Sequence, residues 1–151
     1  MNSNVPRLAR QEDLSGILAL YKTLRPTDPE LTPDVAAQAL TAIIGNPNTE
    51  IVVAEAEGQL CSTCMLGIVP SMAQGARPFG VIEHVVTLPD ARGKGLGKSV
   101  LRFALQLAWE KKCYKVLLLS GEQRKGAHRV YESVGFVGNI ERGFVTKPAE
   151  G

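Results

Sequence analysis

The chain lacks a long apolar run, since no stretch approaches the roughly 18 consecutive apolar residues that a membrane-spanning helix needs. Its N-terminal segment also lacks the basic-then-apolar pattern of a secretion signal. We therefore expect a cytoplasmic protein with no membrane partner. A strong charge of one sign is missing as well. The formal net charge is only +2 with both signs interspersed, which argues against a nucleic-acid binder.

Cysteine is scarce, with only Cys61, Cys64 and Cys113. An odd number in a chain without an export signal predicts free thiols. Cys61 and Cys64 form a C-x-x-C pair, but no second pair or H-x-x-x-H completes a four-ligand zinc site. The pair lies in a strand-like run, where an odd separation is expected to place the two side chains on opposite faces. We therefore expect no metal.

The composition is sufficient for one domain over residues 1–151, because 44% of the residues are hydrophobic and no linker or repeat interrupts them. Apolar periodicity predicts helices over 11–24, 33–44, 96–112 and 127–134. Strands are predicted over 5–9, 51–56, 59–69, 79–88, 114–119, 136–137 and 140–146. This order predicts a mixed α/β (α+β) fold, with a central twisted sheet of roughly six to seven strands flanked by about four helices.

The most informative segment runs from Val81 to Lys98. An apolar run rich in β-branched residues ends at Pro89, a basic loop with three glycines follows, and a helical pattern begins at once. Glycine allows unusual backbone angles and a close approach of a ligand. The start of a helix adds free N–H donors and partial positive charge. The segment therefore predicts a site where backbone amides hold a phosphate.

Two familiar phosphate motifs do not fit this loop. Walker A, G-x-x-x-x-G-K-[ST], matches from Gly97 onward but would need its first glycine at Arg92. The dinucleotide pattern G-x-G-x-x-G matches Gly93 and Gly95 but would need its third glycine at Lys98. A nucleoside-triphosphate site is therefore disfavoured.

The loop instead matches [QR]-x-x-G-x-[GA], as Arg92-Gly93-Lys94-Gly95-Leu96-Gly97. Farther along, Tyr131-Glu132-Ser133-Val134-Gly135-Phe136 matches a Y-E-x-x-G-F element. Together the two motifs resemble the GNAT superfamily of acetyl-CoA-dependent N-acetyltransferases over about residues 79–137. The resemblance implies a GNAT-like fold, acetyl-CoA as co-substrate, and transfer of an acetyl group to a primary amine.

The resemblance also assigns the contacts with CoA. The loop amides would hold the pyrophosphate, and these belong to Arg92, Gly93, Lys94, Gly95, Leu96, Gly97 and Lys98. The central strand and the next one would splay apart around the pantetheine arm, which would bond to the backbone of Val85, Val86 and Thr87. Ser120 matches a pantetheine-binding position of some relatives. A basic cluster of Arg124, Lys125 and Arg129 either meets the CoA 3′-phosphate or forms a solvated face.

An ammonium has no lone pair, so a base must remove a proton before the amine attacks. Glu83 and His84 directly precede the pantetheine segment. Neighbours in a strand point to opposite faces, so we expect only one to reach the substrate. We favour Glu83, and a bulge would reverse that choice. The resemblance assigns Tyr131 as the acid that protonates the leaving thiolate, since a phenol is protonated at pH 7. Alternatively, Glu83 or His84 is a polar residue at the end of the sheet that pairs with a neighbour, and Tyr131 packs its ring against the core.

The acceptor is less constrained by the sequence. Residues 81–86 and 113–116 are similar to glucosamine-6-phosphate N-acetyltransferases, although His84 and Leu119 stand where acids are expected. If the similarity extends to the substrate, the acceptor is an amino sugar phosphate. Otherwise it is another small amine or a protein amine. Arg7, Arg25 and Arg77 lie in segments that could border it.

The sequence leaves one alternative function open, a non-catalytic acyl-CoA sensor on the same fold. It also leaves open whether the chain forms a homodimer that pairs through the edge of the sheet. Trp109 on a charged helix face either marks a subunit contact or lies across neighbouring side-chain stems.

Overall fold

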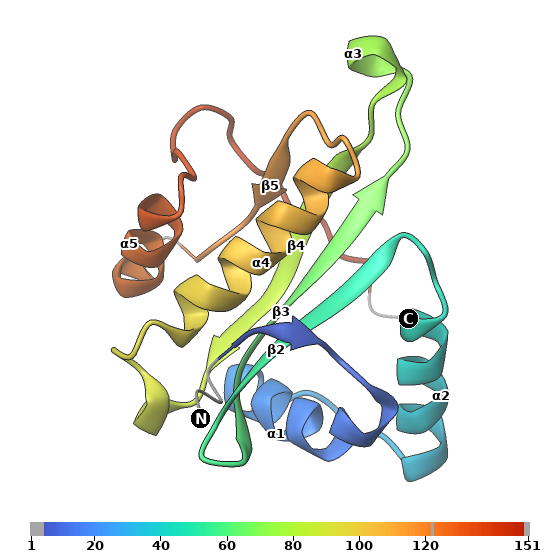
Figure 1. The fold of residues 1–151 in the computed structure, drawn as a ribbon, viewed down its shortest axis with the longest axis vertical. Coiled ribbons are helices and arrows are strands. Elements are labelled where there is room, and N and C mark those ends of the chain that lie inside the picture. The colour runs from blue at the N-terminus through green and yellow to red at the C-terminus, as the bar shows by residue number, and fades with distance from the viewer. Residues whose placement is uncertain (1–4, 122, 150–151) are drawn as a thin grey trace.

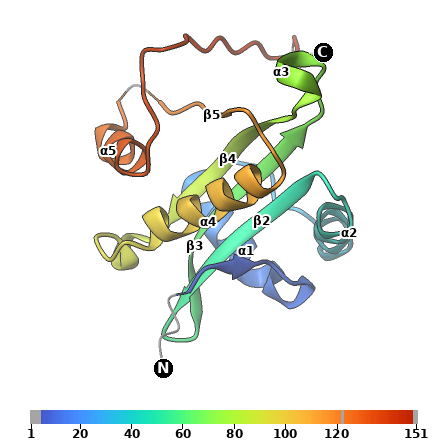
Figure 2. The same cartoon turned by 45° about the horizontal axis from the view of Figure 1, so that its top comes forward.

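The computed structural model describes residues 5–121 and 123–149. A mixed sheet lies at the centre, with strands β1 (Arg7–Leu8), β2 (Thr49–Ala56), β3 (Gln59–Val69), β4 (Phe79–Thr87) and β5 (Val116–Leu118). The helices are α1 (Leu14–Leu24), α2 (Pro33–Ile44), α3 (Ala73–Ala76), α4 (Leu96–Glu110) and α5 (Lys125–Ser133), with single 3-10 turns at Gln11–Asp13 and Pro89–Ala91. Helices α1 and α2 pack on one face of the sheet and α4 and α5 on the other (Figures 1 and 2).

The order of strands follows the order of the chain, and only β4 and β5 are parallel. The mixed fold with flanking helices is confirmed, but the expectation of six to seven strands is wrong. The sheet has five strands within the described ranges, because residues 136–149 do not join it (Figure 2). Residues with high strand propensity form a strand only where the edge of a neighbouring strand is available for pairing. Val137 and Phe144 of this segment instead lie 68% and 86% exposed.

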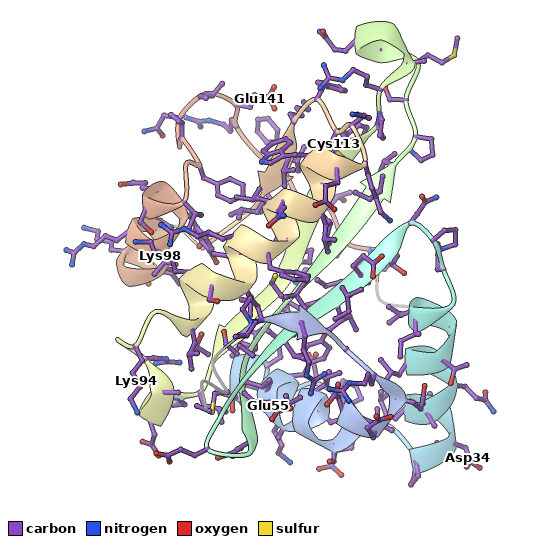
Figure 3. The ribbon with its side chains drawn as sticks, in the orientation of Figure 1. Asp34, Glu55, Lys94, Lys98, Cys113 and Glu141 are labelled. Carbon is purple, nitrogen blue, oxygen red and sulfur yellow. The ribbon has the colours of Figure 1, made fainter. Side chains whose placement is uncertain are left out.

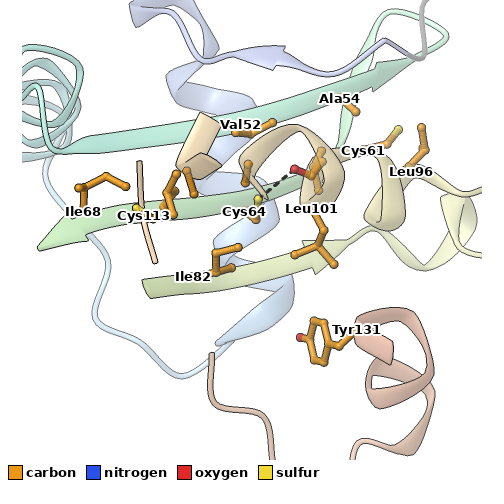
Figure 4. Packing of buried hydrophobic residues seen from close by; sticks show 14 of the residues in the cluster. Val52, Ala54, Cys61, Cys64, Ile68, Ile82, Leu96, Leu101, Cys113 and Tyr131 are labelled. Atoms are coloured by element: carbon orange, nitrogen blue, oxygen red, sulfur yellow. Dashed lines mark hydrogen bonds between the residues drawn. The ribbon is translucent and has the colours of Figure 1, made fainter. Parts of the chain in front are cut away.

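Two apolar clusters, one on each face, hold the layers together. Helix α4 buries the stripe Leu96, Val100, Leu101, Ala104 and Ala108, whose spacing of three to four residues keeps it on one side of the helix. This stripe packs on β2, β3 and β4 (Figure 4). On the other face, Ile17 and Leu20 of α1 pack against β2 with Leu40 of α2.

A β-bulge in β3 changes the expected placement of the C-x-x-C pair. Ala54 pairs with Ser62 and the next residue of β2 pairs with Leu60, so Cys61 is the extra residue. Cys61 and Cys64 therefore lie in the same apolar cluster rather than on opposite faces (Figure 4). All three cysteines are free and buried. Burial raises the pKa of the Cys64 thiol to about 12, so this group is an inert core residue.

Candidate active site

The predicted phosphate loop lies between β4 and α4. Gly95 is the N-cap of α4, and both Gly93 and Gly95 have φ of +80°, which side chains with a Cβ rarely adopt. Within the described part of the chain, no amide from residue 93 to 98 donates to a protein acceptor. Lys94 and Lys98 flank these amides on the loop and the first helical turn (Figure 3). The loop therefore fits an anion such as a pyrophosphate.

The side chain of Arg92 is directed back to β4. Its Nε donates to the carbonyl oxygen of Thr87 at 3.2 Å. The hydroxyl of Thr87 lies 2.8 Å from the hydroxyl of Ser62. Gly97 packs close to Thr87, since a Cβ at Gly97 would lie 3.2 Å from the Thr87 hydroxyl oxygen. These contacts fix the loop on the end of the strand, and they leave the loop backbone as the part of this motif that can receive a phosphate.

Strands β4 and β5 diverge beside this loop. They pair from Gly80 with Val116 to Ile82 with Leu118, and among the described residues no later pair follows. Strand β4 nevertheless continues to Thr87. The backbone of its last five positions, on the side toward β5, therefore has no strand partner. This is the splay that the family resemblance implies around a pantetheine arm.

A cavity of about 60 Å³ opens where the strands diverge. Its lining includes Glu83, His84 and Val85 from β4 and Tyr131 from α5. The structure thus brings together the three predicted catalytic residues. A larger cavity of about 410 Å³ lies between α4, β5 and the segment after α5, and none of the three lines it.

Glu83 and His84 are expected on opposite faces of the strand, but both line the same cavity. The cause is a β-bulge in β4. Met65 pairs with Glu83 and Thr63 with Val86, so two residues of β4, the first of them His84, face one residue of β3. His84 has φ of +55° as a result. The bulge interrupts the alternation of faces and brings both side chains to the cavity.

Tyr131 forms the opposite wall of the cavity. It is 7% exposed, and its ring packs edge-to-face on Phe136 with centroids 6.2 Å apart. Burial raises the pKa of its phenol, and the nearby Arg124 and Ser120 offset part of this increase. The hydroxyl therefore keeps its proton at neutral pH, as an acid must. The Ser120 Oγ is buried without a hydrogen-bond partner among the described residues, so its contact with Tyr131 falls short of hydrogen-bond geometry.

The arginines considered for the acceptor divide into two groups. Arg7 forms ion pairs with Asp13 and Glu55, and the Arg77 guanidinium donates to two backbone carbonyls after α4. Neither lines the cavity. Arg25 does line it, together with Arg124, which the resemblance had placed near CoA or on a solvated face. The other members of that basic cluster, Lys125 and Arg129, are exposed.

Sequence reasoning missed a residue that contacts the site from outside the cavity. Tyr21 of α1 fits the apolar stripe of its helix, and nothing in its spacing sets it apart. In the structure its ring lies 5.2 Å from the ring of His84, tilted by 44°. This contact depends on the bulge and could not be found from the sequence.

Three features lie together here: a loop of free amides, two diverging strands, and a cavity lined by candidate acid and base residues. This combination is typical of transferases that use CoA thioesters. The model of the acetyltransferase (GNAT) family matches residues 17–136, and the chain belongs to this family. It is therefore an acetyl-CoA-dependent N-acetyltransferase.

Three similar proteins illustrate the range of the family. A glucosamine 6-phosphate N-acetyltransferase from Trypanosoma brucei brucei is 32% identical over 130 residues, 86% of each chain. A solved structure of a candidate acetyltransferase from Agrobacterium tumefaciens str. C58 is 43% identical, with a TM-score of 0.88 over 95% of this chain and 99% of that one. A candidate ribosomal protein bS18-alanine N-acetyltransferase from Bacillus subtilis (strain 168) is 28% identical over 72% of this chain and 68% of that protein.

The described residues offer neither a membrane-spanning helix nor a cluster of metal ligands. No helix in residues 5–121 and 123–149 is long and apolar enough to cross a membrane. The same residues contain no group of three or more histidine, cysteine, aspartate or glutamate side chains that could hold a metal ion.

Proposed function

We propose that the enzyme acetylates a primary amine of a small molecule in the cavity between β4 and α5. The observation that carries this proposal is the placement of Glu83 and His84 opposite Tyr131, where the strands diverge. A proton acceptor and a proton donor then lie on the two sides of one cavity, as direct transfer from a thioester to an amine requires.

The chain's own groups supply the binding of acetyl-CoA. The free amides of residues 93–98 receive the pyrophosphate. The unpaired side of β4 over Val85, Val86 and Thr87 offers backbone groups to the pantetheine amides and to the thioester oxygen, which gains negative charge during attack. The buried Ser120 Oγ is a further partner for pantetheine, because it lacks one within the described protein.

Two protons leave the attacking nitrogen during the transfer. Glu83 or His84 takes one proton from the ammonium, and the neutral amine forms the C–N bond. Collapse breaks the C–S bond, and the Tyr131 hydroxyl gives its proton to the sulfur. The second proton of the attacking nitrogen returns to the phenolate through solvent, so one proton is released per turnover.

An amino sugar phosphate is the acceptor that the cavity favours. Arg25 and Arg124 line it beside Glu83, so two guanidinium groups can hold a phosphate while the carboxylate attracts an ammonium. The 32% identity with the glucosamine 6-phosphate N-acetyltransferase supports the same acceptor.

A panel of amines with acetyl-CoA tests this proposal, with the release of CoA thiol as the readout. The panel contains glucosamine-6-phosphate, glucosamine without phosphate, and an aminoglycoside. We expect turnover of the phosphorylated sugar, a drop of 100-fold or more in kcat for Tyr131→Phe, on the order of what one acid contributes, and unchanged binding of acetyl-CoA. Preference for glucosamine over its phosphate would contradict the roles of Arg25 and Arg124.

A protein amine is the second candidate, favoured by the similarity to the bS18-alanine N-acetyltransferase. A peptide with an N-terminal alanine therefore joins the panel. Turnover of the peptide alone would replace the small-molecule acceptor. Binding of acetyl-CoA without turnover of any amine would favour the non-catalytic sensor.

We also propose a homodimer in which the segment after α5 contacts a second copy. Ile140, Phe144 and Val145 are 70% or more exposed, and β5 is an edge strand. Such apolar residues beside an open edge favour pairing between chains. Light scattering should give the mass of a dimer, and Phe144→Ser with Val145→Ser should give a monomer. A monomeric wild type would refute this contact.

The cytoplasmic location stays a prediction from the sequence.

A further inference from the structure

The backbone of His84 has an unusual conformation. Its φ of +55° lies in the left-handed region, which residues other than glycine rarely adopt. Such conformations persist only where the surroundings over-determine them, and they gather at functional sites. The bulge alone does not require an imidazole, since asparagine or glycine would adopt this backbone more readily.

The ring of Tyr21 packs against His84 from α1, with centroids 5.2 Å apart and planes tilted by 44°. Tyr21 is itself fixed, because Ile17 and Leu20 anchor α1 in the core with 3% and 0% exposure. Burial also raises the pKa of the Tyr21 phenol to about 12, so its ring presents no charge to the imidazole. One face of His84 is therefore covered by a rigid helix, while His84 still lines the cavity.

Charged and titratable groups surround the cavity from every element that meets there. Glu83 precedes His84 on β4, Arg25 follows α1, and Arg124 and Tyr131 come from the region of α5. Glu83 is exposed, whereas His84 is half-buried. A carboxylate stabilises the charged form of a neighbouring ammonium. Glu83 therefore suits binding of the amine in its ammonium form. His84, held against Tyr21 and carrying an imidazole nitrogen that can accept a proton, suits removal of the proton from the amine.

We propose that His84, turned into the cavity by the bulge, removes the proton from the attacking amine, and that Tyr21 is its positioning residue. This assignment rests on the proposed function and decides between its two candidate bases. The N–H bond of the ammonium breaks, the freed lone pair attacks the thioester carbon, and the imidazolium later releases its proton to solvent.

Kinetics test the base. We expect kcat at saturating amine to show an acidic limb that Glu83→Gln retains and His84→Asn removes. Asparagine tolerates the left-handed backbone, so this variant preserves the bulge. Its kcat should fall about 100-fold or more, with the KM for acetyl-CoA unchanged. Added imidazole should restore activity to His84→Gly. If His84→Asn keeps both the limb and a near-normal kcat, or if Glu83→Gln removes the limb, His84 is not the base.

Proton NMR tests the positioning without turnover. The chain has only two histidines, so His128→Gln identifies the C2–H signal of His84. Tyr21→Leu should remove the ring-current shift of that signal and lower kcat about tenfold, whereas Tyr21→Phe should preserve both. An unchanged signal in Tyr21→Leu would overturn the positioning role.

The two failures are distinguishable. If the wild-type enzyme acetylates no amine in the panel, the proposed function fails, and with it the role of His84 as base. The NMR comparison would still show whether Tyr21 holds the imidazole. If turnover is normal but the His84 variants behave as the wild type does, only the assignment of the base fails.

Discussion

Replacement of Asp13 by asparagine tests the contact that anchors the start of α1. The Asp13 carboxylate is 9% exposed and accepts two hydrogen bonds from the Arg7 guanidinium, at 2.8 and 3.0 Å, and one from the Arg10 amide at 2.7 Å. Charge-assisted bonds contribute roughly 1.5–3 kcal/mol. Arg7 keeps Glu55 as a partner in the variant. We therefore expect Asp13→Asn to lower the free energy of unfolding by about 2 kcal/mol at pH 7.

The dependence of this loss on pH gives the sharper test. Arg7 lowers the pKa of Asp13 below its ordinary value of 3.8. A carboxyl group with a lowered folded-state pKa contributes stability above its ordinary pKa and loses it as the pH falls through the folded-state value. Urea unfolding should therefore show a constant difference between wild type and Asp13→Asn from pH 8 to about pH 5. The difference should shrink below about pH 4.

An exposed carboxylate of the same turn provides the control. Glu12 is 72% exposed and lies 3.8 Å from Arg10, so Glu12→Gln should change stability by less than about 0.5 kcal/mol. An equal effect of the two variants, or a loss in Asp13→Asn that does not vary with pH, would refute the reasoning.

Two further predictions concern the loop and the core. Gly95→Ala should cost about 1–2 kcal/mol of stability, because its φ of +80° disfavours a Cβ even though nothing lies within 4 Å, and calorimetry should show weaker binding of acetyl-CoA. Gly126→Ala, equally open but helical, should be neutral or stabilising, and a loss in both variants would argue against a backbone cause. Leu101→Ala should cost about 2–5 kcal/mol in urea unfolding, since Leu101 is fully buried. Leu31→Ala, at a site 50% exposed, should stay within about 0.5 kcal/mol.

Features set by neighbouring residues could be predicted from the sequence. The Thr32 side chain accepts from the Val35 amide and Pro33 opens α2, and threonine followed by proline is a typical start of a helix. The glycine loop has the expected positive φ angles at Gly93 and Gly95. In each case the required backbone is decided within one turn of chain, so the residue types carry the information.

Features set by pairing between distant segments could not be predicted. The bulges at Cys61 and His84 arise from the register of β3 with its two neighbours, and neither residue is a typical bulge former. The strands expected over 136–137 and 140–146 contain suitable residues but have no neighbour in the sheet. A β-branched run specifies a strand only when an edge is available to pair with it.

The bulge in β4 explains both the position and the chemistry of the candidate site. The last pair between β4 and β5 joins Ile82 to Leu118, and the bulge begins two residues later at His84. A bulge increases the local twist and ends regular pairing, so the same irregularity that separates β4 from β5 also turns His84 into the opening. Beyond it β4 pairs with β3 again, shifted by one residue, through Thr87. The strand therefore still delivers the phosphate loop to the start of α4. Deletion of one bulge residue, which restores a regular register between β3 and β4, should therefore abolish the cavity and catalysis together while keeping the loop.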